Sequence, residues 1–165
     1  KNLIEKTFPF SIWMSRNPTL SNMHYDSVEN LCLQISGSKK WTLYPPNTGK
    51  YLYESFMLAV YEETKDDILS TDLAYVSVPV DINNPDYTRF PLMKKLPKPI
   101  IVNIDKGDML YLPTYWYHQV ESFPDKNTNV SIAITRWYEN THHKKPGCAR
   151  CKIKLKPEYK VFQST

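Results

Sequence analysis

Two histidines and one aspartate in this chain are of the type and spacing that hold a catalytic metal. His24 and Asp26 are separated by one residue, and His118 lies far downstream. Side chains two residues apart on a β-strand point to the same side, so a strand over residues 20–26 would aim His24 and Asp26 at one ion. Two imidazoles and one carboxylate leave the opposite face of the ion open, a set typical of non-haem Fe(II) enzymes that activate O₂.

The surroundings of His118 favour a metal ligand over the alternative, a core histidine on a sheet. A short apolar run over residues 109–112 predicts a buried strand that Pro113 ends, because proline has no N–H for the ladder. The aromatic residues 115–117 follow and supply a bulky apolar wall, which we expect to shield the centre unless they are ordinary core aromatics. A lone histidine there would most often be structural, whereas the second pair of ligands favours the metal.

Composition indicates one soluble domain with no membrane partner. The chain has 165 residues, of which 41% are hydrophobic and 13% aromatic, and its net charge is +4. No apolar run approaches the roughly 20 residues that span a bilayer, and the first residues lack a secretory apolar region. Three cysteines do not suggest a disulfide framework. We therefore expect a cytoplasmic or nuclear protein.

Short strands separated by turns dominate the pattern along the chain. The expected strands cover residues 8–14, 20–26, 30–36, 40–44, 75–80, 100–104, 109–112, 118–122 and 130–137. Residues 51–54 fit a helical turn and residues 62–67 a charged, exposed loop. Many short strands with few helical segments predict an all-β fold, a double-stranded β-helix of the jelly-roll or cupin type with short helical insertions.

The end of the chain differs in character from the rest. We expect a barrel domain over residues 1–138 and a basic C-terminal appendage over residues 139–165. The appendage holds Cys148 and Cys151 just after two histidines, a set that could hold a structural zinc ion. One such cysteine pair is a weak signal, so free surface thiols remain the alternative.

Three separate blocks of sequence resemble the jumonji-C (JmjC) branch of the Fe(II)- and 2-oxoglutarate-dependent oxygenases. The blocks are HYDSVENLCLQISGSKKWTLYPP at 24–46, NNPDYTRFP at 83–91 and GDMLYLPTYWYHQVES at 107–122. Within the branch the chain is most similar to the small JmjC-only protein hydroxylases, namely the jumonji-7-type lysyl hydroxylases and the asparaginyl hydroxylase that modifies hypoxia-inducible factor. It also resembles the tRNA wybutosine hydroxylase.

The resemblance implies a role for each residue that matches the family motif. His24, Asp26 and His118 match the iron ligands. Lys39 matches the lysine that pairs with the distal carboxylate of the co-substrate 2-oxoglutarate; Ser21 matches a hydroxyl on the same carboxylate and Asn30 an amide lining that pocket.

A physical argument also supports a lysine partner, because a dicarboxylate inside a barrel must meet a fixed cation. The sequence leaves Lys40, beside Lys39, as the alternative.

The chain departs from the family pattern at two places. Many relatives have asparagine where this chain has Thr135, so the amide contact there is lost or passes through water. A tyrosine that contacts 2-oxoglutarate in relatives would precede Lys1, so the resemblance implies that the N-terminal part of the family domain lies upstream.

The resemblance implies an enzyme that uses Fe(II), 2-oxoglutarate and O₂ to hydroxylate a lysyl or asparaginyl side chain of a protein. By family resemblance the substrates would include GTPases and other translation or signalling proteins. Three alternatives stay open: a JmjC methyl-lysine demethylase, a wybutosine-type hydroxylase acting on tRNA, and a non-catalytic binding module.

Overall fold

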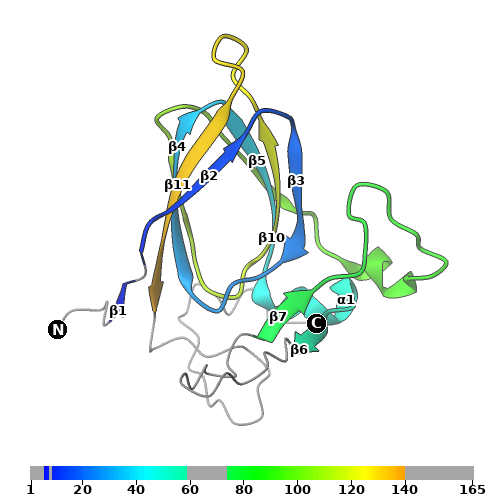
Figure 1. Cartoon of the computed structure of the whole chain (residues 1–165). Coiled ribbons are helices and arrows are strands. Elements are labelled where there is room, and N and C mark those ends of the chain that lie inside the picture. The colour runs from blue at the N-terminus through cyan, green and yellow to red at the C-terminus, as the bar shows by residue number, and fades with distance from the viewer. Residues whose placement is uncertain (1–5, 8, 59–73, 140–165) are drawn as a thin grey trace, which may run out of the picture.

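Two antiparallel sheets face each other and form the body of the protein (Figure 1). The computed structural model describes residues 6–7, 9–58 and 74–139. The expected charged loop at 62–67 and the expected zinc ligands Cys148 and Cys151 lie outside these residues.

The first sheet follows the order β1-β11-β4-β9, and β2 also pairs with β11. Its strands are β1 (Lys6–Thr7), β2 (Ser11–Ser15), β4 (Glu29–Ser36), β9 (Met109–Leu112) and β11 (Ser131–Glu139). The second sheet follows the order β3-β10-β5-β8. Its strands are β3 (Thr19–His24), β5 (Ser38–Tyr44), β8 (Ile100–Ile104) and β10 (Tyr117–Phe123).

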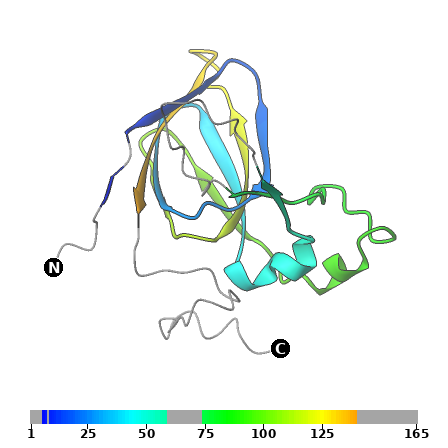
Figure 2. The same ribbon diagram turned by 60° about the horizontal axis from the view of Figure 1, so that its bottom comes forward.

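Short elements gather beside one end of the second sheet (Figures 1 and 2). They are the 3-10 helix η1 (Pro46–Thr48), the helix α1 (Gly49–Leu52), the hairpin of β6 (Ser55–Leu58) and β7 (Ala74–Ser77), and the 3-10 helix η2 (Pro91–Lys95). This architecture confirms the all-β jelly-roll fold with short helical insertions. Within the described residues, no helix is long and apolar enough to cross a membrane.

The expected strands all have counterparts, but one expectation about the site is wrong. The strand expected over residues 20–26 ends at His24, and Asp26 lies in the loop that follows. The chain leaves the sheet there because the Asp26 carbonyl accepts a hydrogen bond from the Tyr115 backbone N–H (2.8 Å) instead of a ladder partner. Asp26 therefore reaches His24 from a loop, not by alternation along one strand.

The turn between β4 and β5 depends on Gly37. Its φ is +71°, in the left-handed region that glycine adopts without strain. A Cβ at this position would lie 2.3 Å from the carbonyl oxygen of Phe123. Glycine thus permits the tight hairpin that carries Lys39 at the start of β5.

Two apolar clusters stabilise the body. One lies between the sheets and comprises Cys32, Trp41, Leu43, Ile104, Leu112, Val120 and Ala133. The other covers the outer face of the second sheet and comprises Met23, Tyr44, Leu52, Val78, Val80, Met93 and Tyr117. The end of the second sheet that carries Tyr44 and Tyr117 is therefore packed on both faces, which suits strands that must hold side chains in fixed positions.

The inward face of β4 is largely polar. Asn30, Cys32 and Gln34 are buried, whereas Leu31 and Leu33 on the opposite face are only partly buried. Buried polar side chains are costly unless they have partners. A strand that turns its polar face inward therefore suggests that the interior receives a polar ligand.

Candidate metal centre

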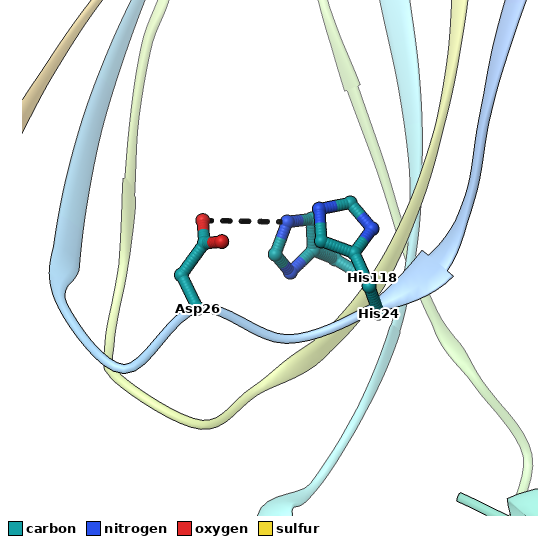
Figure 3. Close-up of side chains that lie close together, drawn as sticks. All are labelled: His24, Asp26 and His118. Atoms are coloured by element: carbon teal, nitrogen blue, oxygen red, sulfur yellow. Dashed lines mark ion pairs between the residues drawn. The ribbon is translucent and has the colours of Figure 1, made fainter. Parts of the chain in front are cut away.

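The pairing of β3 with β10 brings the two histidines together. His24 and His118 are cross-strand partners, and their ring centroids are 4.2 Å apart with an interplanar angle of 53°. Asp26 faces both rings from the loop after β3, and its Oδ2 lies 3.8 Å from His118 Nε2 (Figure 3). Ligand atoms of the three side chains all lie within 4.8 Å of one another.

Backbone carbonyls fix which nitrogen of each imidazole carries the proton. His24 Nδ1 lies 2.6 Å from the Asn22 carbonyl oxygen, and His118 Nδ1 lies 3.0 Å from that of Trp116. A carbonyl oxygen only accepts hydrogen bonds, so Nδ1 carries the proton in each ring. The lone pair is then on Nε2, the tautomer that a metal-binding histidine needs.

His118 is electrically neutral at physiological pH. Burial and, second, the neighbouring His24 lower its pKa to about 4, although Asp26 and the hydrogen bond to Trp116 act in the opposite direction. The short separation from Asp26 is therefore not an ion pair at neutral pH. The lone pair of His118 Nε2 and the carboxylate oxygen of Asp26 face each other instead, an arrangement suited to a cation that both would bind.

Asp26 is held from two sides. Its backbone carbonyl accepts the N–H of Tyr115, which has φ of +66° in the left-handed region. Its Oδ2 accepts a long hydrogen bond from Trp137 Nε1 (3.4 Å) on β11. The carboxylate is thus oriented by one sheet while the histidines come from the other.

Lys39 and Lys40 point to opposite sides of β5. Lys39 is buried and donates a hydrogen bond to Ser122 Oγ (2.6 Å) on β10. Lys40 is partly exposed and forms an ion pair with Glu121 (2.8 Å). Lys39 is the inward lysine of the pair, and the position of Lys40 on the outer side argues against the alternative that the sequence left open.

The Lys39 ammonium is an uncompensated charge inside the barrel. Across the part of the chain that the structure describes, no carboxylate lies within ion-pair distance of it. Burial lowers the pKa of Lys39, and the nearby Cys32 partly offsets this. A buried cation without an anion is unfavourable, so this position fits an anionic ligand.

The other three expected co-substrate residues differ in their placement. Asn30 is buried on β4, and its Oδ1 has no hydrogen-bond partner among the described residues. Thr135 is buried on β11, and its hydroxyl accepts a hydrogen bond from Trp13 Nε1 (2.9 Å), which leaves its own proton available to donate. Ser21 lies opposite the inward-facing Val120 but is exposed to solvent.

Three residues near the site carry no family expectation and were missed from the sequence. Ser122 contacts Lys39, Trp137 contacts Asp26, and Trp41 lies beside His118 with ring centroids 5.7 Å apart. Alternation along β5 and β10 is the signal that could have placed Trp41 and Ser122 on the same face as Lys39 and His118. No local signal marks Trp137.

The aromatic residues at 115–117 do not act as one wall. Tyr117 is fully buried on the outer face of the second sheet, where its hydroxyl donates a short hydrogen bond to Glu54. Trp116 packs against the cluster between the sheets. Tyr115 meets Tyr25 edge to face, with centroids 5.6 Å apart. The expected shielding of the centre therefore does not extend to Tyr117.

The donor set fits Fe(II) together with an organic dianion. His24, Asp26 and His118 offer two nitrogen lone pairs and a carboxylate at one point, the combination of the facial triad. The buried ammonium of Lys39 offers positive charge inside the barrel, and the N–H of Trp41, which has no partner among the described residues, offers a donor. A ligand with an acid group at each end matches these two places.

Comparison with known proteins agrees with this geometry. Residues 4–144 match the model of the cupin-like domain. The chain is 27% identical over 146 residues to the lysine-specific demethylase JMJ32 of Arabidopsis thaliana, covering 78% of this chain and 41% of that protein. It is 27% identical over 135 residues to the human bifunctional peptidase and (3S)-lysyl hydroxylase JMJD7, covering 78% of this chain and 41% of that protein.

A third relative has a nucleic-acid name. The human tRNA wybutosine-synthesizing protein 5 is 30% identical over 119 residues, which cover 72% of this chain and 32% of that protein. The chain spans less than half the length of each of these three relatives.

Proposed function

The chain belongs to the cupin-like domain family, in its JmjC branch, and on that premise we propose that it is an Fe(II)- and 2-oxoglutarate-dependent dioxygenase that hydroxylates a side chain of a protein. The observation that carries the proposal is the convergence of His24, Asp26 and His118, with both Nδ1 atoms turned to backbone carbonyls, in a barrel whose interior also holds the buried ammonium of Lys39.

The residues proposed to bind the metal and the distal carboxylate lie at two different places in the barrel interior. His24, Asp26 and His118 would hold the metal, and Lys39 would bind the distal carboxylate of 2-oxoglutarate. Bound Fe(II) supplies the chemistry in which O₂, 2-oxoglutarate and a C–H bond give succinate, CO₂ and an alcohol.

The chain's own residues provide position, charge and exclusion of water. The carbonyls of Asn22 and Trp116 fix the two imidazoles, and Trp137 orients the carboxylate of Asp26. Asn30 and Thr135 are buried polar groups that would line the co-substrate pocket, and Ser21 would add a hydroxyl if the ligand reaches it. These contacts hold the three metal-binding side chains in position before a metal binds.

A protein substrate is favoured by the name of the JMJD7 relative, which is a lysyl hydroxylase. The JMJ32 relative is named a demethylase, and hydroxylation of a methyl-lysine methyl group would release that methyl group through the same site. The wybutosine relative keeps tRNA as a second candidate substrate. Every residue in the proposed mechanism is common to the three reactions.

The test is turnover with candidate substrates, followed by mass spectrometry of the products. Iron-loaded protein is incubated with 2-oxoglutarate, O₂ and unmodified proteins, methyl-lysine peptides or tRNA. Gain of an oxygen atom on a lysyl or asparaginyl side chain supports the proposal. Loss of a methyl group from lysine, or oxidation of tRNA alone, replaces it with one of the other two reactions. A chain that binds its partner without consuming 2-oxoglutarate would be a binding module.

A further inference from the structure

Trp41 lies between the two ends of the proposed co-substrate site. On β5, the side chains of Lys39 and Trp41 share the inward face, because they are two residues apart. Lys39 pairs with Ser122 on β10, and Trp41 pairs with Val120, one step nearer His118. The Trp41 and His118 rings are 5.7 Å apart at 37°. A ligand that reaches from the metal ligands to Lys39 must therefore pass Trp41.

The indole nitrogen of Trp41 is a buried donor without an acceptor. The residue is 4% exposed, and within the described ranges Nε1 has no hydrogen-bond partner. Leaving such a group unpaired is unfavourable, so unpaired donors in a folded core are uncommon and point to a bound ligand or an ordered water.

A buried carboxylate at Lys39 needs more donors than the lysine has. An ammonium offers three N–H groups, and Lys39 gives one of them to Ser122 Oγ. At most two remain for an ionised carboxylate, which has about four acceptor sites. The N–H of Trp41 is a donor on the same face of the same strand, so it can supply part of the shortfall.

We propose that Trp41 determines co-substrate selectivity, with its indole N–H donating to the carboxylate that Lys39 binds. This inference rests on the proposed function. It makes Trp41 a specificity residue and not only a member of the apolar cluster between the sheets. Its ring packs in that cluster, while the nitrogen serves the ligand.

The experiment compares two keto acids that differ only at the distal end. In 2-oxopentanoate a methyl group replaces the distal carboxylate of 2-oxoglutarate, and the metal-binding end is unchanged. Dissociation constants for both ligands are measured by calorimetry with the full chain loaded with Mn(II), so that no turnover is needed. The variants are Trp41→Phe and a chain with benzothienylalanine at position 41, in which sulfur replaces the N–H and the ring shape is retained.

The expected result is a loss confined to the dicarboxylate. Removing the N–H should weaken 2-oxoglutarate about ten- to a hundredfold, as for a lost hydrogen bond to a charged group, and change 2-oxopentanoate less than about threefold. Equal weakening of both ligands would show that Trp41 only packs, and would overturn the inference, as would unchanged binding of both. If Trp41→Phe does not fold, the benzothienylalanine protein decides between these outcomes.

The same titration separates this inference from its premise. Tight binding of 2-oxoglutarate by the wild-type protein, with no effect of either variant, overturns the role of Trp41 and leaves the proposed function standing. Failure of the Mn(II)-loaded wild-type protein to bind 2-oxoglutarate overturns the proposed function and the role of Trp41 together.

Discussion

His24 and His118 are direct partners across β3 and β10, with imidazole centroids 4.2 Å apart. The antiparallel pair of β3 and β10 thus joins two residues far apart in sequence, and on its other side β10 pairs with β5, where His118 lies opposite Leu43. A bulge in the pairing lies between His118 and Val120. Both histidines of the proposed metal site thus come from the second sheet, and a bulge is a common device for directing a side chain at such sites.

The substitution Lys39→Met tests whether the buried ammonium binds 2-oxoglutarate or stabilises the fold. Lys39→Met should weaken 2-oxoglutarate by about a hundredfold or more, because the buried carboxylate would lose its cation. The ligand-free variant should melt at a higher temperature than the wild type, because the buried ammonium that it removes is destabilising. Calorimetry and thermal unfolding measure both effects.

The stability gain of Lys39→Met should depend on pH in a defined direction. The pKa of Lys39 is lowered in the folded state, so the cost of burying its charge is fully present at neutral pH, declines as pH rises above that lowered pKa, and is gone near the ordinary value of 10.5. Lys40→Met is the matched control, since it removes only a partly exposed ion pair with Glu121. Equal loss of 2-oxoglutarate binding in both variants would show that Lys39 is not the specific partner of the distal carboxylate.

Trp137→Phe should weaken metal binding without unfolding the protein. The substitution removes the indole donor to Asp26 Oδ2, and loss of a partner behind a metal ligand typically costs ten- to a hundredfold in affinity. The long 3.4 Å contact favours the lower end, about tenfold. Trp13→Phe is the control, since Trp13 touches Trp137 edge to face but donates to Thr135. Mn(II) titration that gives equal affinities for wild type and Trp137→Phe would refute the role.

Tyr117→Phe should destabilise the fold and leave metal affinity unchanged. The hydroxyl donates to Glu54 beneath α1, and burial together with Glu54 raises the pKa of Tyr117 so that it stays protonated. Loss of a hydrogen bond to a partly buried acceptor such as Glu54 should cost about 1 kcal/mol. Chemical unfolding measures the loss, and replacing Glu54 with leucine in the same chain should recover part of it. A parallel fall in Mn(II) affinity would show that the outer face controls the metal site.

The Cys32 thiol should be inert toward alkylation in the folded protein. Burial raises its pKa to about 11, with Lys39 acting weakly in the opposite direction. The reactive thiolate therefore forms in the folded state only as pH approaches that value, whereas in the unfolded chain it forms near pH 9. Peptide mapping after iodoacetamide treatment at pH 8 should find Cys32 unmodified in native protein and modified in urea. Rapid native modification would contradict its placement between the sheets.

Strand positions were predictable from the sequence because short alternating or apolar runs end at Pro and Gly. Pro113 separates β9 from β10, and Gly37 makes the turn between β4 and β5. The inward face of β4 could not be read in the same way. Its leucines face outward and its Asn30 and Gln34 face inward, so the usual rule of apolar residues inside gives the wrong side. A ligand-binding interior reverses the rule.

The clustering of His24, Asp26 and His118 was predictable from residue type, but the position of Asp26 in a loop was not. A strand over residues 20–26 would also have turned Asp26 toward His24. In the structure, however, the Asp26 carbonyl is held by the backbone N–H of Tyr115, 89 residues later. No local sequence pattern marks the left-handed conformation of Tyr115. Lys39 and Lys40 were equivalent in sequence and separate only when β5 pairs with β10. Pairwise contacts between distant strands decide these details, and local sequence carries little information about them.

The most direct test of the proposed function is anaerobic titration of the Fe(II)-loaded protein with 2-oxoglutarate, in which the visible charge-transfer absorption band is measured after each addition. The wild-type protein and Lys40→Met should develop a saturable band, and His118→Ala, folded by circular dichroism, should develop none. A folded wild-type protein without the band, or a band that persists in His118→Ala, would contradict the assignment of His24, Asp26 and His118 as the iron site.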